Sequence, residues 1–554
     1  MSESESSRFW ADYIVEELKT RAKTVPRLTE IVKERGYIVY DEKTPSGRIH
    51  IGPARGWLIH DTVTRALRNA GLEARFILSS DDMDPMDDLP PYIDPGYKKY
   101  MGLPLRNIPS PDGSSKSFAQ YFFEEATSKF SEYGIKAELE STGERYIRGD
   151  FDWAIKKALD SADIIDEIYN QFYGKKRRKL PFNPICENCG RIGTTQAYNW
   201  DSESELVKYE CSPDLVKWAK GCDHRGEISP YKGNGKLPWK VEWAAKWPTV
   251  GVIYEIAGKD HFSKGGSRSI SIRISDQVYN YPPPYPSTPV KTGKGHEFFT
   301  IDGKKMSTSK GFGMNFAEMT ELAPGHILRY LFVRTRPISA IEFNIQGTDK
   351  LLALYDAFDR TERIYFGLET GDVNEKEIIK QKRLYELAYV GKIPEQMPPQ
   401  VSFSYCVTLI QVTSTIEEAI QRLQDMGSLK GALEQWERDY MVERLQAARG
   451  FLKHAPDRLK ITLAEPSKLQ LAGNQVSALK EFSALLTNNL DEEQMKERIG
   501  EIMKNNDINN KELFKLLYQV ITGENRGPRL MPFINDIGKE KVKAIIDKTI
   551  ELST

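Results

Sequence analysis

Apolar side chains follow two different periods along this chain. Residues 36–40 and 71–80 contain short apolar runs typical of strands, whereas apolar positions at residues 57–67 recur at helical spacing. The first part of the chain therefore predicts a strand, a tight loop, a helix and a second strand. A further strand is predicted at residues 250–256.

Helical periodicity dominates elsewhere, and from Met314 onward the chain becomes helical. This pattern predicts a helical C-terminal half, for which a bundle is the simplest packing. The helical stripes lie at residues 9–18, 118–130, 155–173, 327–333, 351–358, 416–426, 433–452, 476–486 and 511–521.

The loop between the first strand and its helix, Thr44–Pro53, carries the first candidate chemistry. Pro45 and Gly47 supply a turn. The N-terminus of the following helix offers free backbone N–H groups and a positive dipole end, which suit a phosphate. His50 can donate to a phosphate oxygen, and Gly52 lets a flat base lie against the backbone. The alternative is an ordinary strand-to-helix turn with a surface histidine.

A second polar loop lies much later in the chain, within Phe298–Gly311. The segment begins as an apolar strand, turns at an Asp-Gly pair and continues into a mobile polar loop with three lysines.

Four of the five cysteines lie close together in the sequence: Cys186, Cys189, Cys211 and Cys222. Two thiolates at knuckle spacing can hold one tetrahedral ion and a second pair can complete it, which predicts a structural zinc site. His224 could replace one thiolate. The alternatives are a redox pair or incidental thiols.

Composition narrows the class of protein. The 554 residues suggest about four domains. A net charge of −1 gives no global basic field, so any RNA contact must come from local patches such as Lys175–Lys179. Long apolar runs and signal-peptide features are lacking, so we expect a cytoplasmic protein with no membrane contact.

An acidic cluster follows the second predicted strand. Its members are Asp81, Asp82, Asp84, Asp87 and Asp88. Such a cluster either binds Mg²⁺ or forms a solvated loop, and the sequence favours the solvated loop.

The two polar loops together resemble the His-Ile-Gly-His and Lys-Met-Ser-Lys-Ser signatures of class I aminoacyl-tRNA synthetases. The segments Gly258–Ser267 and Gly523–Leu530 resemble the class I lysyl-tRNA synthetases in particular. The resemblance covers most of the chain. It implies a Rossmann-type α/β catalytic core with a zinc-binding insertion and an all-α C-terminal anticodon-binding domain.

The same resemblance implies a division of the chain into five parts. They are the first half of the catalytic domain (1–100), a connective insertion with the zinc module (101–235), the second half of the catalytic domain (236–295), a signature-loop and stem-contact domain (296–370) and the anticodon-binding domain (371–554).

The implied activity is the ATP-dependent formation of lysyl-adenylate, with Mg²⁺, and transfer of the lysyl group to tRNA(Lys). The implied catalytic residues are His50, Lys305, Ser307, Thr308, Ser309 and Lys310; those for ATP are Ser46, Gly47, His50, Gly52, Pro53, Lys305 and Thr308. Pro53 replaces the second signature histidine. Thr308 replaces the second signature lysine, which leaves Lys310 as the candidate for that charge.

The implied L-lysine pocket contains Thr44, Trp243, Asp260 and His261, with the last three expected at strand ends beyond the insertion. An aromatic wall such as Trp243 can hold an ammonium group, and Asp260 can neutralise it. Core packing is the alternative for Trp243. At the level of the whole chain, the alternatives are a glutamyl enzyme of the same class and a non-catalytic RNA-binding paralogue.

Overall fold

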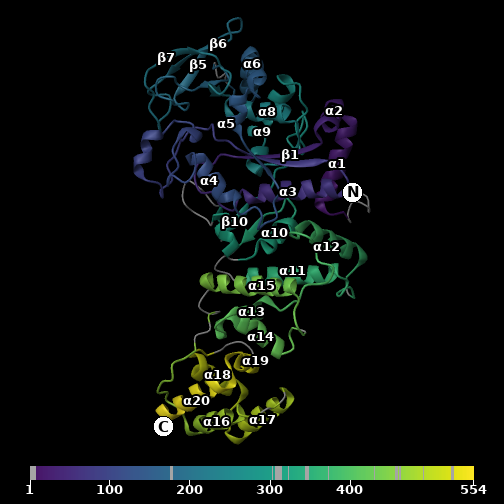
Figure 1. Cartoon of the computed structure of the whole chain (residues 1–554), viewed down its shortest axis with the longest axis vertical. Coiled ribbons are helices and arrows are strands. Elements are labelled where there is room, and N and C mark those ends of the chain that lie inside the picture. The colour runs from purple at the N-terminus through teal and green to yellow at the C-terminus, as the bar shows by residue number, and fades with distance from the viewer. Residues whose placement is uncertain are drawn as a thin grey trace. The chain divides into compact units, whose positions relative to one another are not determined.

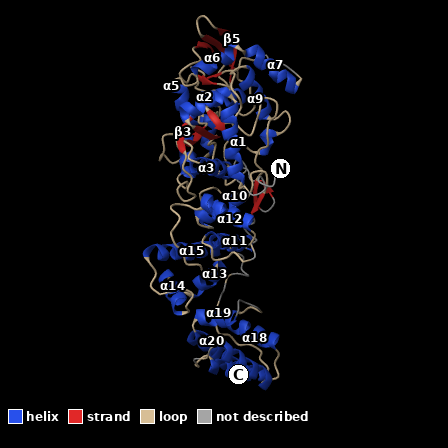
Figure 2. Cartoon of the chain, turned by 90° about the vertical axis from the view of Figure 1, so that its right-hand side faces the viewer, coloured by secondary structure: helices blue, strands red, loops and turns tan. Residues whose placement is uncertain are grey.

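The computed structural model describes residues 8–554 apart from 175–178, 302–303, 306–314, 322, 344–348, 372, 430, 456–459, 461–462, 489, 491 and 526–529. The chain divides into two compact units. The first comprises Met1–Thr320, Pro324–Ile345 and Ala357–Met397, and the second comprises Glu321–Ala323, Gln346–Asp356 and Pro398–Thr554. All described strands belong to the first unit, and the described part of the second is helical (Figure 2).

A four-stranded parallel sheet forms the centre of the first unit. Its strands are β1 (Tyr37–Lys43), β2 (Ala74–Ser80), β3 (Glu138–Ser141) and β9 (Val252–Tyr254), in the order β3-β2-β1-β9. All three neighbouring pairs are parallel. The structure confirms the first two predicted strands, whereas the predicted strand at 250–256 is shortened because a helix continues to Val250.

Helices cover both faces of this sheet (Figure 1). One face is covered by α3 (Ala54–Asn69) and α1 (Trp10–Thr24), and the other by α8 (Trp239–Val250) and α9 (Ser267–Gln277). Adjacent side chains at the end of β9 show this division. The ring of Tyr254 lies 5.5 Å from that of His60 on α3, whereas Glu255 bonds to Trp243 on α8. Successive side chains of a strand point to opposite faces, so the sheet is buried between two helical layers.

The other helices of the first unit confirm most of the predicted stripes. They are α2 (Pro26–Arg35), α4 (Phe118–Thr127), α5 (Thr142–Arg148), α6 (Asp152–Asp160), α7 (Ala162–Tyr173), α10 (Gly325–Arg334) and α12 (Glu375–Ala388). The single helix predicted at 155–173 is wrong in one respect. Ser161 leaves the helical region with φ −109° and ψ 22°, and it separates α6 from α7.

The insertion between β3 and α8 forms two small sheets. One pairs β4 (Asn183–Pro184) with β8 (Gly235–Lys236) in antiparallel fashion. The other contains β5 (Thr195–Asp201), β6 (Leu206–Cys211) and β7 (Arg225–Ile228) in that order. A third sheet follows β9 in the chain and consists of β10 (Phe299–Ile301), β11 (Lys304–Lys305) and β12 (Ile341–Phe343).

The second unit is built from helices, and the stripes predicted at residues 416–426, 433–452, 476–486 and 511–521 correspond to four of these helices. The helices of this unit are α13 (Phe403–Val412), α14 (Ile416–Asp425), α15 (Gln435–His454), α16 (Gly473–Leu485), α17 (Glu492–Asn505), α18 (Asn510–Thr522), α19 (Leu530–Ile537) and α20 (Lys539–Ser553); α11 (Asp349–Tyr365) contributes residues to both units. Asn509 caps α18 at its start, and Gly523 ends it with a φ of 77°. Within the described helices, none is long and apolar enough to cross a membrane.

A buried ion pair joins α3 to α10. The Asp61 carboxylate lies 2.7 Å from Arg329 and 2.9 Å from Arg65, and it accepts from the backbone N–H of Lys136 at 2.9 Å. Burial alone would raise the pKa of Asp61, but the charges of Arg329 and Arg65 outweigh it and hold that pKa below its usual value. The aspartate is therefore ionised in the folded protein.

Replacing Asp61 by alanine should destabilise the first unit by about 3–5 kcal/mol, because Arg329 would remain buried without its partner. The stabilisation should be present at neutral pH and be lost as the pH falls through the lowered pKa of Asp61, since protonation removes the charge. Calorimetry of the full chain measures both effects. Glu16→Ala is the control: it breaks a largely exposed pair with Lys19 on α1 and should cost less than about 1 kcal/mol. Equal effects of the two substitutions would contradict this expectation.

Candidate active site at the carboxyl ends of the sheet

The loop that follows β1 is held by its own hydrogen bonds. The backbone N–H of Gly52 donates to Nδ1 of His50 at 3.0 Å, and a Cβ at Gly52 would lie 2.5 Å from the His50 ring. The position therefore requires glycine because of a close approach. The N–H groups of Ala54 and Arg55 donate to Ile51 and Gly52, so these two are not the free donors predicted from the sequence. Ser46 is half-buried and Gly47 is buried in the same loop.

Residues that follow the second signature segment contact the first signature segment, although the two lie far apart in the chain. His50 forms an antiparallel bridge with Asn315, and the N–H of Phe316 donates to the carbonyl of Ile49 at 3.0 Å. On the other side of the second signature, β11 pairs with β10 through Thr300 and Lys305. Ser307, Thr308, Ser309 and Lys310 lie outside the described residues, as does the side chain of Lys305.

A buried ionic cluster lies at the carboxyl ends of β1 and β2. It contains four carboxylates and two ammonium groups, contributed by Glu42, Asp81, Asp84, Glu242, Lys236 and Lys246. Lys236 lies 3.0 Å from Asp81 and 3.2 Å from Glu242, and it also pairs with Asp84. Lys246 pairs with Glu42 and Glu242. We name these six side chains the ionic cluster.

Protonation in the ionic cluster is set by burial and by like charges. Burial raises the pKa of Glu42 to about 8, against the opposing charge of Lys246. Burial and the neighbouring Asp81 charge raise the pKa of Asp84 to about 6. Burial opposes the charge of Lys236, yet Asp81 and Asp84 hold its pKa well above the usual value. The two lysines therefore stay charged, and the cluster keeps an excess of carboxylates.

This geometry corrects the interpretation of Asp81, Asp82 and Asp84 as parts of a solvated loop, whereas Asp87 and Asp88 are exposed as that interpretation predicts. Asp81 and Asp82 are buried, and Asp82 accepts from Ser141 at 2.7 Å and from the N–H of Gly143 at 2.8 Å. Asp84 accepts from the hydroxyl of Thr44 at 3.0 Å. The aspartates thus order the end of the sheet, and one of them reaches a predicted substrate residue.

A cavity of ≈ 310 Å³ opens beside the ionic cluster. Asp84, Lys236 and Trp239 line one side of it, next to the parallel sheet, and Trp218 and Thr195 of the insertion line the other. The site is therefore bounded by both parts of the first unit.

Trp243 lies inside α8 and not at a strand end, which corrects the sequence prediction. Its indole N–H donates to Glu255 at 2.9 Å, and the guanidinium carbon of Arg268 lies 5.3 Å from its ring centroid. Trp239 stacks against the same ring at 5.8 Å, and only 7% of Trp243 is exposed. A buried protein cation therefore already contacts this ring.

Asp260 and His261 lie in a short 3₁₀ helix, Lys259–Phe262, which follows β9. The His261 ring packs edge-on against Trp239 at 5.5 Å and against Trp243 at 5.7 Å. Asp260 is exposed. The structure thus brings His261 to the tryptophans, and it joins Thr44 to the ionic cluster.

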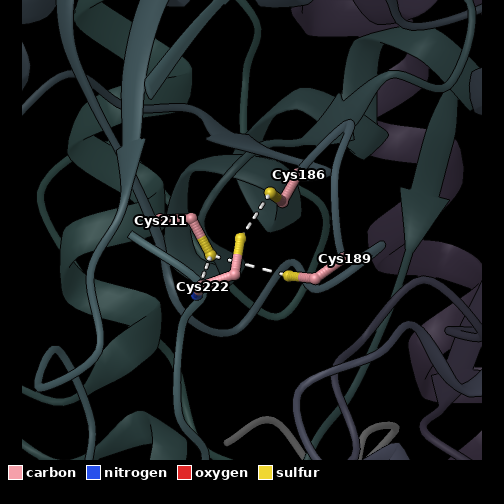
Figure 3. Close-up of side chains that lie close together, drawn as sticks. All are labelled: Cys186, Cys189, Cys211 and Cys222. Atoms are coloured by element: carbon pink, nitrogen blue, oxygen red, sulfur yellow. Dashed lines mark hydrogen bonds between the residues drawn. The ribbon is translucent and has the colours of Figure 1, made fainter. Parts of the chain in front are cut away.

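The four clustered cysteines come together in the insertion (Figure 3). The sulfur atoms of Cys186 and Cys222 lie 3.6 Å apart, and those of Cys189 and Cys211 lie 3.7 Å apart. These separations are far longer than a disulfide of about 2.05 Å. They match the edge of about 3.8 Å that a tetrahedron with metal–sulfur distances of about 2.3 Å requires.

The donor set therefore fits a tetrahedral zinc ion. All four sulfurs lie within 4.8 Å of one another, and His224 is not a member of this group. The His224 ring instead lies 6.1 Å from that of Tyr209. Cys211 ends β6, and Cys186 and Cys189 belong to the turn after β4, so both small sheets of the insertion meet at this cluster.

Comparison with known proteins supplies the context for this site. Residues 8–391 match the family of tRNA synthetases class I (K), and residues 445–550 match an anticodon-binding domain. The chain belongs to the class I tRNA synthetases. Its parallel sheet is thus a class I catalytic fold, and its last helices form an anticodon-binding domain.

Curated relatives extend this similarity over nearly the full length. A lysine–tRNA ligase of Methanosphaera stadtmanae is 30% identical, over 97% of this chain and 98% of its own. A lysine–tRNA ligase of Methanocaldococcus jannaschii is 31% identical, over 96% of this chain and 98% of its own. One from Thermococcus kodakarensis is 32% identical, over 96% and 98% respectively.

Sequence reasoning missed the ionic cluster of this synthetase. Its members come from three segments, around residues 42, 81–84 and 236–246, and each looks like an ordinary polar stretch by itself. The only local signal is the spacing of Glu242 and Lys246, which places both on one face of a helix. Their burial became visible only when the three segments were brought together.

Proposed function

We propose that this chain is a lysine–tRNA ligase, which activates L-lysine with MgATP and transfers the lysyl group to the 3′ end of tRNA(Lys). One observation carries the proposal: the chain matches curated lysine–tRNA ligases over nearly its whole length and theirs. The excess of buried carboxylates beside the site agrees with a cationic amino acid.

The proposed reaction has two steps. An oxygen of the lysine carboxylate attacks the α-phosphorus of ATP and the bond to the bridging oxygen breaks, so pyrophosphate leaves. A ribose hydroxyl at the 3′ end of tRNA then attacks the carbonyl carbon of lysyl-adenylate, and AMP leaves. Mg²⁺ offsets phosphate charge, and the protein mainly positions groups and stabilises developing charge.

The ATP side of the site is proposed at the two signature segments. His50 steadies the phosphates, Gly52 supports the adenine ring, and Ser46, Gly47 and Pro53 shape the loop. The bridge between His50 and Asn315 supports this proposal, because it brings the chain just beyond the second signature segment next to the first. Lys305 and the segment Ser307, Thr308, Ser309 and Lys310 are proposed to clamp the leaving pyrophosphate.

The lysine side is proposed at Thr44, Trp243, Asp260 and His261. The ionic cluster supports this assignment, since Asp81, Asp84 and Glu242 outnumber the two ammonium groups even with Glu42 protonated at neutral pH, and Asp84 bonds to Thr44. Such a field attracts the ammonium end of lysine and repels the side chain of glutamate. Arg268 and Trp239 already pack against the Trp243 ring. We therefore propose that Trp243 acts on lysine through His261, whose ring packs edge-on against it.

A structural zinc ion is proposed at Cys186, Cys189, Cys211 and Cys222, because their separations fit a tetrahedral site. When bound, zinc would join the turn after β4 to the end of β6, and it would take no part in the chemistry. The five-part division predicted from the sequence, with an insertion at 101–235 and an anticodon domain from 371, is proposed as the functional organisation. The cytoplasm is the proposed location.

An exchange assay tests the central proposal. Purified protein should catalyse ATP–pyrophosphate exchange with L-lysine and not with L-glutamate, because the carboxylate side chain meets a negative field. L-Arginine is the control amino acid, because its side chain carries the same positive charge as that of lysine. Exchange with glutamate alone would indicate the glutamyl alternative, and no exchange with any amino acid would indicate a non-catalytic RNA-binding protein.

A pair of matched substitutions tests the lysine pocket. Trp243→Phe and Trp247→Phe each remove an indole N–H that donates to Glu255, at 2.9 and 2.7 Å, but only Trp243 contacts His261. Trp243→Phe should raise the KM for lysine several-fold and leave the KM for ATP unchanged, because it alters contact with one substrate. Trp247→Phe should change neither. Equal effects would show that Trp243 acts only in the core.

Metal analysis tests the zinc proposal. Freshly purified protein should contain one zinc per chain, and Cys189→Ser should lower that content, since a thiolate ligand is lost. Cys406→Ser is the control, because Cys406 is buried in the second unit away from the cluster. Zinc-free wild-type protein, or equal loss in both variants, would contradict the assignment.

A further inference from the structure

Lys236 lies where the insertion returns to the catalytic domain. Its backbone pairs with Asn183 in the β4–β8 ladder, and its side chain is 3% exposed. The ammonium group contacts three carboxylates: Asp81, Asp84 and Glu242. A single buried charge thus holds groups from two segments of the chain.

Asp84 links this charge to the site. Its Oδ1 accepts from Lys236, and its Oδ2 accepts from the hydroxyl of Thr44 at 3.0 Å. The side chain of Asp84 is 26% exposed, against 2% for Asp81 and none for Glu242, and it lines the cavity of ≈ 310 Å³. Asp84 therefore bonds to the interior with one oxygen and to a site residue with the other.

We infer that Lys236 is a positioning residue for amino-acid binding, which fixes Asp84 so that its second oxygen orients the hydroxyl of Thr44. This inference rests on the proposed placement of the lysine pocket at Thr44. Neither Lys236 nor Asp84 needs to touch the substrate for this effect.

Electrostatics explain why the lysine is required. Without Lys236, the carboxylates of Asp81, Asp84 and Glu242 would repel one another at short range. Lys246 cannot take over, because it is bound to Glu42 and Glu242, and among the described residues Lys236 alone forms an ion pair with Asp84. The most exposed carboxylate, Asp84, would turn toward water and release Thr44.

A double-mutant cycle tests the link. Asp84→Ala and the isosteric Thr44→Val should each raise the KM for lysine about tenfold and change the KM for ATP less than about twofold, as expected for one lost hydrogen bond on one substrate. The double variant should be no worse than either single one, because Asp84 acts through Thr44. Additive effects would show that Asp84 acts independently and would overturn the inference.

Substitution of Lys236 completes the test. Lys236→Arg keeps a cation and protects folding, but a planar guanidinium cannot take the place of one ammonium among three carboxylates, so the KM for lysine should rise and that for ATP should not. Lys232→Met is the control, because Lys232 is 65% exposed on the same connection and its ammonium contacts Asp152 and the carbonyl of Arg148, neither of which belongs to the ionic cluster. An equal rise of both KM values in Lys236→Arg would indicate a structural role and overturn the inference.

A readout without substrate separates this inference from the proposed function. The γ-methyl NMR signal of Thr44, assigned by its loss in Thr44→Val, should shift in Asp84→Ala and in Lys236→Arg but not in Lys232→Met. If the wild-type protein fails to activate lysine, the proposed function falls. The methyl shifts would still show whether Lys236 orients Thr44 through Asp84. An unmoved Thr44 signal in Lys236→Arg would refute it.

Discussion

The arrangement of the catalytic domain depends on one electrostatic constraint, which is the ionic cluster at the carboxyl ends of β1 and β2. Four of its six side chains are buried, and Glu42 and Asp84 are partly buried. Removing such groups from water costs several kcal/mol per ion, and only close pairing offsets this cost. Lys236 and Lys246 must therefore stay on their carboxylates, which fixes the insertion and α8 against the sheet. Thr44, one of the residues predicted to bind the amino acid, donates to Asp84 of this cluster.

The parallel sheet explains why these groups meet. In a parallel sheet all strands end at the same edge, so residues that follow β1, β2 and β9 converge although they are far apart in the chain. Thr44 follows β1, Asp84 follows β2 and His261 follows β9. Helical layers pack on both faces of this sheet, and a reaction that depends on positioning requires its groups to be held in place.

The insertion reaches the site by a different route. Its four thiols lie where its two small sheets meet. One of these sheets, β4–β8, includes Lys236, which pairs with Asn183. Sheets of two or three short strands are marginally stable alone, so a metal ion at the thiols would supply the missing stabilisation. A structural ion at the thiols and the buried Lys236 would then both stabilise the β4–β8 sheet.

The sequence by itself determined the local elements and the chemistry of contiguous motifs. Strands β1 and β2, the helix after Thr44–Pro53 and the C-terminal helices follow from apolar periodicity, because that signal lies within a few turns of chain. The cysteine spacing likewise predicted four thiols that the structure brings together, and the two signature loops indicated the synthetase family. Tertiary structure decided the rest. It placed Trp243 in a helix beside Arg268, and it buried aspartates that looked like a solvated loop. Local sequence could not show this, because a charged side chain is buried only when its partner arrives from a distant segment, as Lys236 does for Asp84.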